Sequence, residues 1–526
     1  MRTGVTRPTA RPLAFRLKSA GLLTASLLFW GCASDTGPVV TDASPMFGEK
    51  TFNEGFEFIS SHYYRAVDFR QLALAGLGGL SKVDPGVAVE AAGSNLVLKA
   101  GGTSAGTIRM PRTDDAQGWA AATGAAIAQL RTASAPLKDA EAEDIYKAVF
   151  DGMMRQLDPN SRYTTATRGA AERAERNGYG GIGVTLDDEG GRFRVGGLIE
   201  NGPAARAGVR TGEMIAAIDG ESTKGLPTAT VRDRLRGRPG SIVLLTLDSD
   251  GKVRQVQVQR EQIIPPTTAM RVEDGIAIIS ISRFNAGTES EVRNRVAAAR
   301  RQAGDRLRGY VLDLRGNPGG YLDQAVHVAD AFVTGGDLLF TRGRHPKSGS
   351  HWTAKQDDIG EGLPMVVLVD KGSASAAEIL AAALQDRGRA VVVGSVSYGK
   401  GSVQNIRTLQ TGGEIILTWS RIFAPSGYTF HQQGIMPQVC TSRDGVDEAS
   451  LTAEIREGRY QLPATLASWR RAAPEDATAL AQLRETCPWK EHDPALDLRV
   501  AKRIILDTPL YQRALALTVP GTVASR

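Results

Sequence analysis

The stretch MVVLVDKGSASAAEILAAALQDRGRAVVVGSV, residues 365–396, decides the fold of the central part of the chain. Its first five residues form an unbroken apolar run, which is typical of a strand buried on both faces. A helical pattern begins just after Ser375, and a second apolar run follows at residues 390–396. Because strand and helix alternate in this way over residues 263–445, the sequence predicts an α/β layer architecture.

Ser375 stands at the corner where the predicted buried strand turns into a helix. The first N–H groups of a helix, here those of Ala376 and Ala377, have no partner within the helix, and the helix dipole is positive there. An acyl-transfer transition state needs such donors beside its nucleophile. Ser375 and Glu378 also fit a capping box, in which the serine only begins the helix. Both interpretations stay open on this stretch alone.

A base for such a serine is predicted further along the chain. None of the six histidines lies in a serine-hydrolase context, and G-x-S-x-G is absent from the sequence. Lys400 stands between two glycines at the end of an apolar strand, where burial would lower its pKa and leave a neutral amine to take the serine proton. Gln404 could orient that amine. The alternative is a Ser-His-Asp hydrolase with His327 or His431 as base.

A glycine-rich stretch, GYGGIGVTL at residues 178–186, leads into a predicted strand. Glycine permits positive φ, so that successive N–H groups can turn toward one anion. The order of loop, strands and turns over residues 178–262 resembles a PDZ domain, which binds a C-terminal carboxylate and adds the tail as a strand. The alternative is a small β-barrel that only packs. The resemblance implies a peptide-binding loop of Tyr179, Gly180, Gly181, Ile182, Gly183 and Val184.

Three motifs, together with the PDZ stretch, resemble the C-terminal processing peptidases, also called tail-specific proteases. They are the segment around Ser375 and Lys400, YVLDLRGNPGGYLDQAV at residues 310–326, and FAPSGYTFHQQGIMPQ at residues 423–438. The likeness covers roughly residues 50–440. It implies a serine endopeptidase that forms an acyl-enzyme, with Ser375 as nucleophile, Lys400 as base and Gln404 as its assistant.

The glycine loop RGNPGG also acquires a role from this resemblance. One backbone N–H, from Gly319 or Gly320, would join that of Ala376 in an oxyanion hole; the alternative is a tight strand-to-helix connection. The chain departs from the family pattern at Ala377, where a further serine is usual, and at Gln438, where an aspartate is usual. Neither departure touches the proposed chemistry.

The resemblance implies a multidomain α/β fold: a crotonase-like α/β protease core, an inserted PDZ domain (a small β-barrel plus helices), and helical N- and C-terminal regions. A chain of 526 residues is long enough for two to four compact units. The predicted divisions are a signal peptide at 1–32, a linker at 33–45, a mainly helical N-terminal region at 46–177, the PDZ domain at 178–262, the serine protease core at 263–445 and a helical C-terminal region at 446–526.

The start of the chain predicts export. Five basic residues and no acid precede the apolar run AGLLTASLLFWG at residues 20–31, which is the layout of a secretory signal and is too short to span a bilayer. The sequence Gly31-Cys32 resembles a bacterial lipoprotein box, in which Cys32 is lipidated, although Phe29 and Trp30 depart from its usual residues. Ordinary cleavage near Ala33 or Ser34 would instead give a soluble exported protein. The predicted location is the bacterial cell envelope, in the periplasm.

Composition and charge restrict the kinds of molecule that the chain is expected to bind. Without the five basic residues of the leader, the net charge of +6 falls to +1, so the basic balance does not indicate a nucleic-acid surface. The chain has no H-E-x-x-H and no phosphate-loop spacing, and no cofactor or metal is expected. Expected partners are unfolded or tail-exposing proteins, a membrane through the lipid anchor, and further copies of the chain docked through the helical regions. The rival to the protease is a catalytically silent PDZ scaffold that binds protein tails.

Two cysteines remain after Cys32. Cys440 and Cys487 lie 47 residues apart, and an oxidising compartment permits a disulfide between them. The alternative is two buried free thiols.

Overall fold

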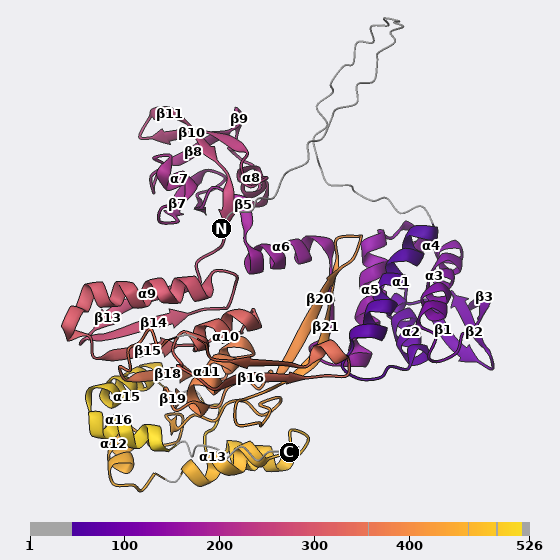
Figure 1. Ribbon diagram of the computed structural model, residues 1–526. Helices are drawn as coiled ribbons and strands as arrows, with labels where there is room; N and C mark the ends of the chain where they lie inside the picture. The colour runs from indigo at the N-terminus through magenta and orange to yellow at the C-terminus, as the bar shows by residue number, and fades with distance from the viewer. Residues whose placement is uncertain (1–44, 356, 461, 491–492, 518–526) are drawn as a thin grey trace, which may run out of the picture. The chain divides into compact units, whose positions relative to one another are not determined.

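The computed structural model describes residues 45–355, 357–460, 462–490 and 493–517 (Figure 1). The predicted signal peptide and the lipidation site at Cys32 lie outside these residues. Within the described ranges, no helix is both long and apolar enough to cross a membrane. The architecture agrees with the predicted fold class: an α/β core, a small domain of strands and short helices at the predicted PDZ position, and helices toward both ends of the described chain.

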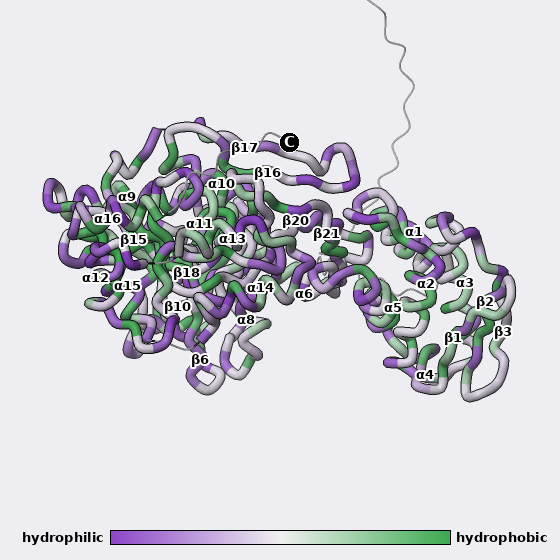
Figure 2. Tube along the Cα trace, turned by 90° about the horizontal axis from the view of Figure 1, so that it is seen from below, coloured by the Kyte–Doolittle hydropathy of each residue, from purple (hydrophilic) through white to green (hydrophobic). Residues whose placement is uncertain are grey.

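The core is built on a six-stranded sheet in the order β13-β14-β15-β18-β19-β22. Strand β13 is antiparallel to β14, and the other neighbours are parallel. All five residues of β18 are buried, as the unbroken apolar run predicts, and β18 is hydrophobic along the trace in Figure 2. The strands span Thr268–Glu273 (β13), Ile276–Ile281 (β14), Gly309–Asp313 (β15), Met365–Val369 (β18), Val391–Gly394 (β19) and Val439–Cys440 (β22).

Helices cover both faces of this sheet. Val367 and the residues that point the same way pack against α9 (Thr288–Ala303), α10 (Leu322–Asp330) and α11 (Ala376–Asp386). Val366 and Leu368 pack on the opposite face, because successive side chains of a strand alternate. That face is covered by α12 (Glu448–Arg456), α15 (Pro494–Leu506) and α16 (Thr508–Ala516). The C-terminal helices therefore form one layer of the core.

The C-terminal region also holds α13 (Leu462–Arg471) and α14 (Ala477–Arg484). Cys440 and Cys487 are joined by a disulfide and are fully buried, in a small cluster with Trp469 of α13. The bond ties the segment after α14 to the last strand of the core sheet.

A second sheet, in the order β17-β16-β21-β20, links the core to the N-terminal region. Leu409, Ile415 and Leu417 of its β20–β21 hairpin are buried in the N-terminal hydrophobic core. Strand β4 also pairs with β21. The elements of this sheet span Arg162–Thr164 (β4), Asp337–Arg342 (β16), Ser350–Thr353 (β17), Ser402–Thr408 (β20) and Glu414–Phe423 (β21), and the short helices Gly304–Arg306 (η2) and Pro346–Ser348 (η3) stand before β15 and β17.

The N-terminal region is mainly helical and also holds a three-stranded sheet in the order β1-β2-β3. Strand β1 pairs with β2 along its whole length and has only its first residue buried, so little apolar pattern marks it. The elements span Pro45–His62 (α1), Phe69–Gly78 (α2), Gly79–Lys82 (η1), Val87–Ala92 (β1), Asn95–Ala100 (β2), Thr103–Arg109 (β3), Ala116–Ala133 (α3), Ala135–Asp139 (α4) and Ala142–Leu157 (α5).

Helix α6 (Ala166–Asn177) leads into the PDZ domain. The main PDZ sheet has the order β11-β10-β8-β7-β6, so β6 is an edge strand. Strands β10 and β11 form a hairpin whose turn residues, Asp250 and Gly251, both have positive φ. The elements span Tyr179–Gly181 (β5), Val184–Asp188 (β6), Phe193–Leu198 (β7), Pro203–Arg206 (α7), Met214–Ile218 (β8), Glu221–Ser222 (β9), Thr228–Leu235 (α8), Ile242–Ser249 (β10), Lys252–Gln259 (β11) and Glu261–Ile263 (β12).

Candidate active site

Ser375 lies at a sharp corner between β18 and α11. Its backbone adopts φ 54° and ψ −112°, a conformation that a non-glycine residue rarely adopts. Residues held in such conformations are typical of active sites, where surrounding contacts maintain the strain. The corner therefore distinguishes Ser375 from an ordinary helix cap, whose backbone is extended.

The turn before Ser375 is held by Asp370. Its Oδ1 atom accepts hydrogen bonds from the N–H groups of Gly372 at 2.9 Å and Ser373 at 3.0 Å. The Ser373 hydroxyl donates to the carbonyl of Leu314 at 2.8 Å, just before the glycine loop RGNPGG. Ser373 is thus a turn residue that ties this corner to the glycine loop.

The glycine loop is ordered by Asn317, whose side chain is fully buried. Asn317 Nδ2 donates to the carbonyl of Ile281 at 2.7 Å, while its Oδ1 accepts from the N–H of Gly319 at 2.8 Å. The N–H groups of Gly320 and Ala376, in contrast, donate to no other group in the described part of the chain. The two glycines named by the sequence therefore differ, and Gly320 is the one with an available donor.

Lys400 follows β19 in a glycine-flanked loop and is largely buried. Burial lowers the pKa of its ammonium group, and the guanidinium of Arg162 on β4 lowers it further. The Glu378 and Asp158 carboxylates act in the opposite direction. The Lys400 amine forms no ion pair or hydrogen bond with any described residue, Ser375 included, and Gln404 Nε2 donates to Ser402 Oγ at 2.9 Å.

Glu378 joins the two segments that carry Ser375 and Lys400. The side chain is fully buried, and its carboxylate accepts hydrogen bonds from the N–H groups of Ser375 at 2.7 Å, Gly399 at 2.7 Å and Lys400 at 2.8 Å. The Ser397 hydroxyl donates to it at 2.5 Å. Burial raises the pKa of the Glu378 carboxyl to about 7. The capping-box interpretation identified the contact with Ser375 but missed the contact with the lysine loop.

Ser375, Lys400 and Gln404 line one cavity of about 400 Å³, called the Ser375 cavity below. Gly320 lines it as well, and apolar side chains from α11, β17, β20 and β21 form much of its wall. The position of Arg162 in the cavity was not predicted, because β4 lies more than 200 residues before Ser375 in the chain. The lining also includes Arg176, Leu322, Trp352, Ile379, Val403, Trp419 and Ile422.

The histidine alternative finds no support in this geometry. His327 lies on α10, and His431 is buried with its pKa lowered to about 4, first by burial and then by the nearby Arg421. Neither side chain is among the described residues that line the Ser375 cavity.

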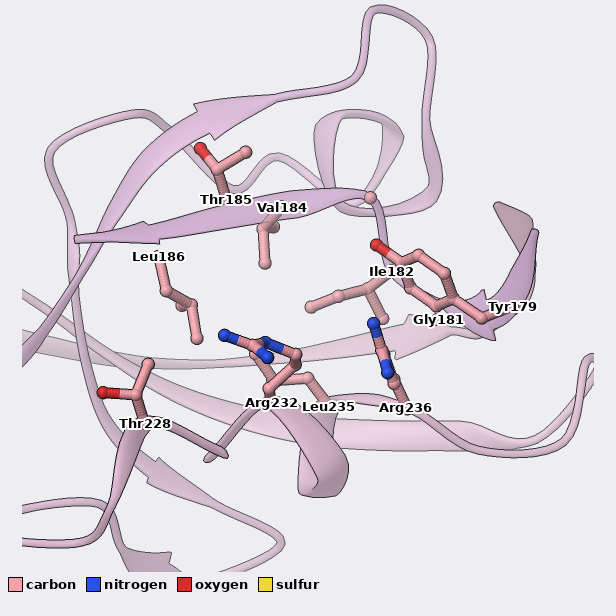
Figure 3. Close-up of a pocket in the computed structure, with 11 residues that line it drawn as sticks. Tyr179, Gly181, Ile182, Val184, Thr185, Leu186, Thr228, Arg232, Leu235 and Arg236 are labelled. Carbon is pink, nitrogen blue, oxygen red and sulfur yellow. The ribbon is translucent and has the colours of Figure 1, made fainter. Parts of the chain in front are cut away.

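A second groove, of about 260 Å³, lies in the PDZ domain between β6 and α8 (Figure 3). Five of the six residues predicted to bind a peptide line it, and this PDZ groove includes Ile182 and Val184. Gly180 instead pairs with β12, and its carbonyl accepts from Gly237. The N–H groups of Ile182 and Gly183 donate to no other group in the described ranges, and Gly183 has φ 75°. Such neighbouring free N–H groups can receive an anion.

Comparisons with known proteins match both the core that holds the Ser375 cavity and the domain that holds the PDZ groove. Residues 275–441 match the family model of peptidase family S41, and residues 194–248 match that of the PDZ domain. A carboxy-terminal-processing protease of Bartonella bacilliformis is 36% identical over 301 residues, which are 56% of this chain and 69% of that protein. A "Probable CtpA-like serine protease" of Staphylococcus aureus (strain N315) is 32% identical over 306 residues, 57% of this chain and 61% of that protein.

Among solved structures, the photosystem II D1 C-terminal processing protease is 28% identical, with 56% of this chain and 81% of that chain covered and a TM-score of 0.34. The family therefore rests on the sequence matches. The chain belongs to peptidase family S41, together with the carboxy-terminal-processing proteases, and its class is that of a serine-type peptidase with a PDZ domain. Its substrates are proteins.

Proposed function

We propose that this chain is a serine endopeptidase that captures protein C-termini in the PDZ groove and cleaves the polypeptide with a Ser375–Lys400 dyad. The observation that carries the proposal is the shared cavity, which brings a strained serine, a buried lysine and a free oxyanion donor together. The three groups come from separate loops of the core, and a merely structural serine would require none of the others.

The proposed reaction begins with a neutral Lys400 amine that accepts the hydroxyl proton of Ser375. Burial and Arg162 favour the neutral amine, since both lower the lysine pKa. The serine oxygen then bonds to the carbonyl carbon of the scissile peptide. The carbonyl oxygen becomes an oxyanion, which the N–H groups of Ala376 and Gly320 would stabilise.

The second half of the reaction releases both products. The C–N bond breaks as the lysine ammonium returns its proton to the leaving amine, which leaves an acyl-enzyme ester on Ser375. Water, deprotonated by Lys400, then attacks the ester carbon. The bond from that carbon to the Ser375 oxygen breaks as the lysine ammonium returns the proton to this oxygen, which releases the second product as a carboxylic acid and restores both Ser375 and the neutral Lys400. Gln404 would hold the lysine amine near Ser375 once its present bond to Ser402 is exchanged.

Tail capture is supported by the geometry of the PDZ groove. A free carboxylate would accept hydrogen bonds from the N–H groups of Ile182 and Gly183. The tail would then extend along β6, whose free edge is available because β6 stands at the end of its sheet. A loosely folded protein with an exposed C-terminus fits this mode of binding, and its adjoining segment would reach the Ser375 cavity.

The proposal also includes export of the protein to the cell envelope and its attachment to a membrane. The leader before residue 32 favours export to the cell envelope, and the Gly31-Cys32 motif favours a lipid anchor at Cys32. The Cys440–Cys487 disulfide is the bond expected of a protein that folds in an oxidising compartment. The predicted domain boundaries and any association between copies of the chain remain predictions.

The test is cleavage of an unfolded reporter with an apolar C-terminal tail. Wild type would be compared with Ser375→Ala and Lys400→Ala, and with a reporter whose C-terminus is amidated. We expect both variants to lose activity and amidation to slow the wild type. Undiminished cleavage by both variants would place the chemistry elsewhere. Binding of the tail without any cleavage by wild type would favour the silent scaffold.

A further inference from the structure

Two cations stand in the PDZ groove without an anion. Arg232 and Arg236 of the α8 segment both line it, and neither forms an ion pair with a carboxylate in the described part of the chain. The third arginine of this segment, Arg234, pairs with Glu221 at 2.7 Å and does not line the groove. The groove therefore carries a local positive charge that the domain leaves uncompensated.

The two arginines lie at different depths along the groove. The Arg236 guanidinium stacks on the ring of Tyr179, 4.3 Å from its centroid, beside the loop that would receive the tail carboxylate. Arg232 lies one helical turn earlier and points toward β6, in the middle of the groove (Figure 3). Arg236 thus belongs to the carboxylate end, and Arg232 would face a residue upstream in the tail.

The spacing of a helix and a strand indicates which residue that would be. Side chains of an added strand alternate, so the last residue and the antepenultimate residue would both face α8. They would lie about 6.6 Å apart along the strand, and the four-residue step back along α8 from Arg236, its C-cap, to Arg232 is similar, about 6 Å. The last residue would then meet Ile182 and Leu235, which are buried and apolar. The antepenultimate residue would meet Arg232.

The hydroxyl at the start of α8 already donates its proton within the domain. Thr228, at the start of α8, donates its hydroxyl to Asp188 at 2.7 Å and is therefore occupied. The Asp188 carboxylate accepts further from the N–H of Gly191, and these two bonds lower its pKa, so that it stays ionised. Arg232 is the charged side chain that lines the groove at this depth, and it has no carboxylate partner in the described part of the chain.

We propose that the PDZ groove selects protein tails that carry an acidic residue, aspartate or glutamate, two positions before an apolar last residue, through an ion pair with Arg232. The proposal rests on the proposed capture of C-termini and specifies its substrate class. Because Arg232 is exposed and the pair would be partly solvated, the expected preference is modest, about fivefold in Kd for glutamate over glutamine.

The test uses the full chain with Ser375→Ala, so that peptides are bound but not cut. Fluorescent peptides with an apolar last residue would differ only at the antepenultimate position, as glutamate, glutamine or lysine, and each would also be made as the C-terminal amide. Affinity would be measured by anisotropy at low and high salt. We expect the glutamate peptide to bind best and its advantage to shrink with added salt, because salt screens exposed charges.

Three variants of the arginines sharpen the result. Arg232→Gln should abolish the advantage of glutamate over glutamine, and Arg232→Glu should transfer the preference to the lysine peptide. Arg234→Gln, on the same helix but outside the groove, should keep the preference of the parent. A glutamate preference that survives both substitutions of Arg232 would overturn the proposal.

The proposed capture and the proposed selectivity fail in different ways. Binding that needs the free carboxylate but ignores the antepenultimate residue would overturn the selectivity alone. Binding that is unaffected by amidation, or that no peptide shows, would overturn tail capture and the selectivity with it.

Discussion

The PDZ groove takes all of its lining from residues 179–236, whereas the Ser375 cavity takes its lining from residues between 162 and 422. In the PDZ groove, two arginines have no carboxylate partner in the described part of the chain. Beside the Ser375 cavity, the buried Glu378 side chain holds the serine corner and the lysine loop together through hydrogen bonds. A groove for recognition can be built within one small domain and keep its charges free for a ligand. A cavity for chemistry brings several loops together and uses a buried contact to hold them.

Removal of the proposed nucleophile should separate the two sites most strongly. Ser375→Ala should lower the cleavage rate by at least about 10³-fold, because the proposed acyl-enzyme forms on the Ser375 oxygen. Its affinity for a tail peptide should change by less than about twofold, since the PDZ groove shares no lining residue with the Ser375 cavity. Reporter cleavage and peptide anisotropy measure the two effects. Equal losses in both assays would mean that the sites are not independent.

Removal of the disulfide should destabilise the core without weakening the PDZ groove. The double substitution Cys440→Ser and Cys487→Ser should reduce the free energy of unfolding by about 2–4 kcal/mol. Urea unfolding, followed by tryptophan fluorescence, measures the change, since Trp469 lies beside the bond. Wild type treated with a reductant should show the same loss. If the substituted chain were as stable as the oxidised wild type, the bond would have no stabilising role.

Glu378→Gln should disturb the link between the serine corner and the lysine loop. A glutamine has one oxygen where the carboxylate has two, so at least one of the three N–H donors would lose its acceptor. We expect a loss of about 1–3 kcal/mol in stability and at least a tenfold lower rate, with unchanged tail affinity. An unchanged rate would show that the link is unnecessary for the chemistry.

The same variant tests the pH dependence of stability. In the folded chain the pKa of Glu378 is raised to about 7, above the ordinary glutamate range, so the folded state holds its proton more tightly than the unfolded state does. This contribution to stability is complete below about pH 4 and is lost as the pH rises through 7. Between pH 5 and pH 8 the free energy of unfolding of Glu378→Gln should therefore fall less than that of wild type, as urea titrations at each pH would measure.

Arg162→Gln should give the smallest effect, a shift of the pH–rate profile. The Arg162 guanidinium lowers the pKa of Lys400, so its removal should raise that pKa and move the rise of kcat/KM to higher pH. At neutral pH the rate should fall a few-fold. Arg168→Gln is the matched control, because Arg168 contacts the same Glu172 but exerts no effect on Lys400. A profile shifted to lower pH would contradict the role of Lys400 as base.

The sequence predicts the parts of these sites that local patterns encode. A buried strand, a helix start and a glycine-flanked lysine each leave a mark within a few residues, and so does the glycine loop of the PDZ domain. The sequence does not indicate whether Gly319 or Gly320 has a free N–H for an oxyanion. The answer depends on the side chain of Asn317, whose Oδ1 accepts the hydrogen bond from the Gly319 N–H.

What the sequence leaves out depends on contacts between distant segments. The N-terminal region contributes Arg162 to the Ser375 cavity, and no periodicity predicts that β4 pairs with β21. The amphipathic pattern of α15 and α16 indicates that each helix has an apolar face, but not that both lie on the core sheet. An amphipathic pattern indicates that one face of a helix is buried, but it does not indicate which other element packs against that face.

The position of α15 and α16 also has a consequence for how the protein is made. Synthesis proceeds from the N-terminus, so the face of the core sheet that carries Val366 and Leu368 exists before its cover does. Residues 494–516, which form the two helices, are the last described part of the core to leave the ribosome. The loops that carry Ser375 and Lys400 therefore rest on a sheet whose second face is covered only after residues 494–516 have been synthesised, and a chain interrupted before α15 would expose an apolar surface.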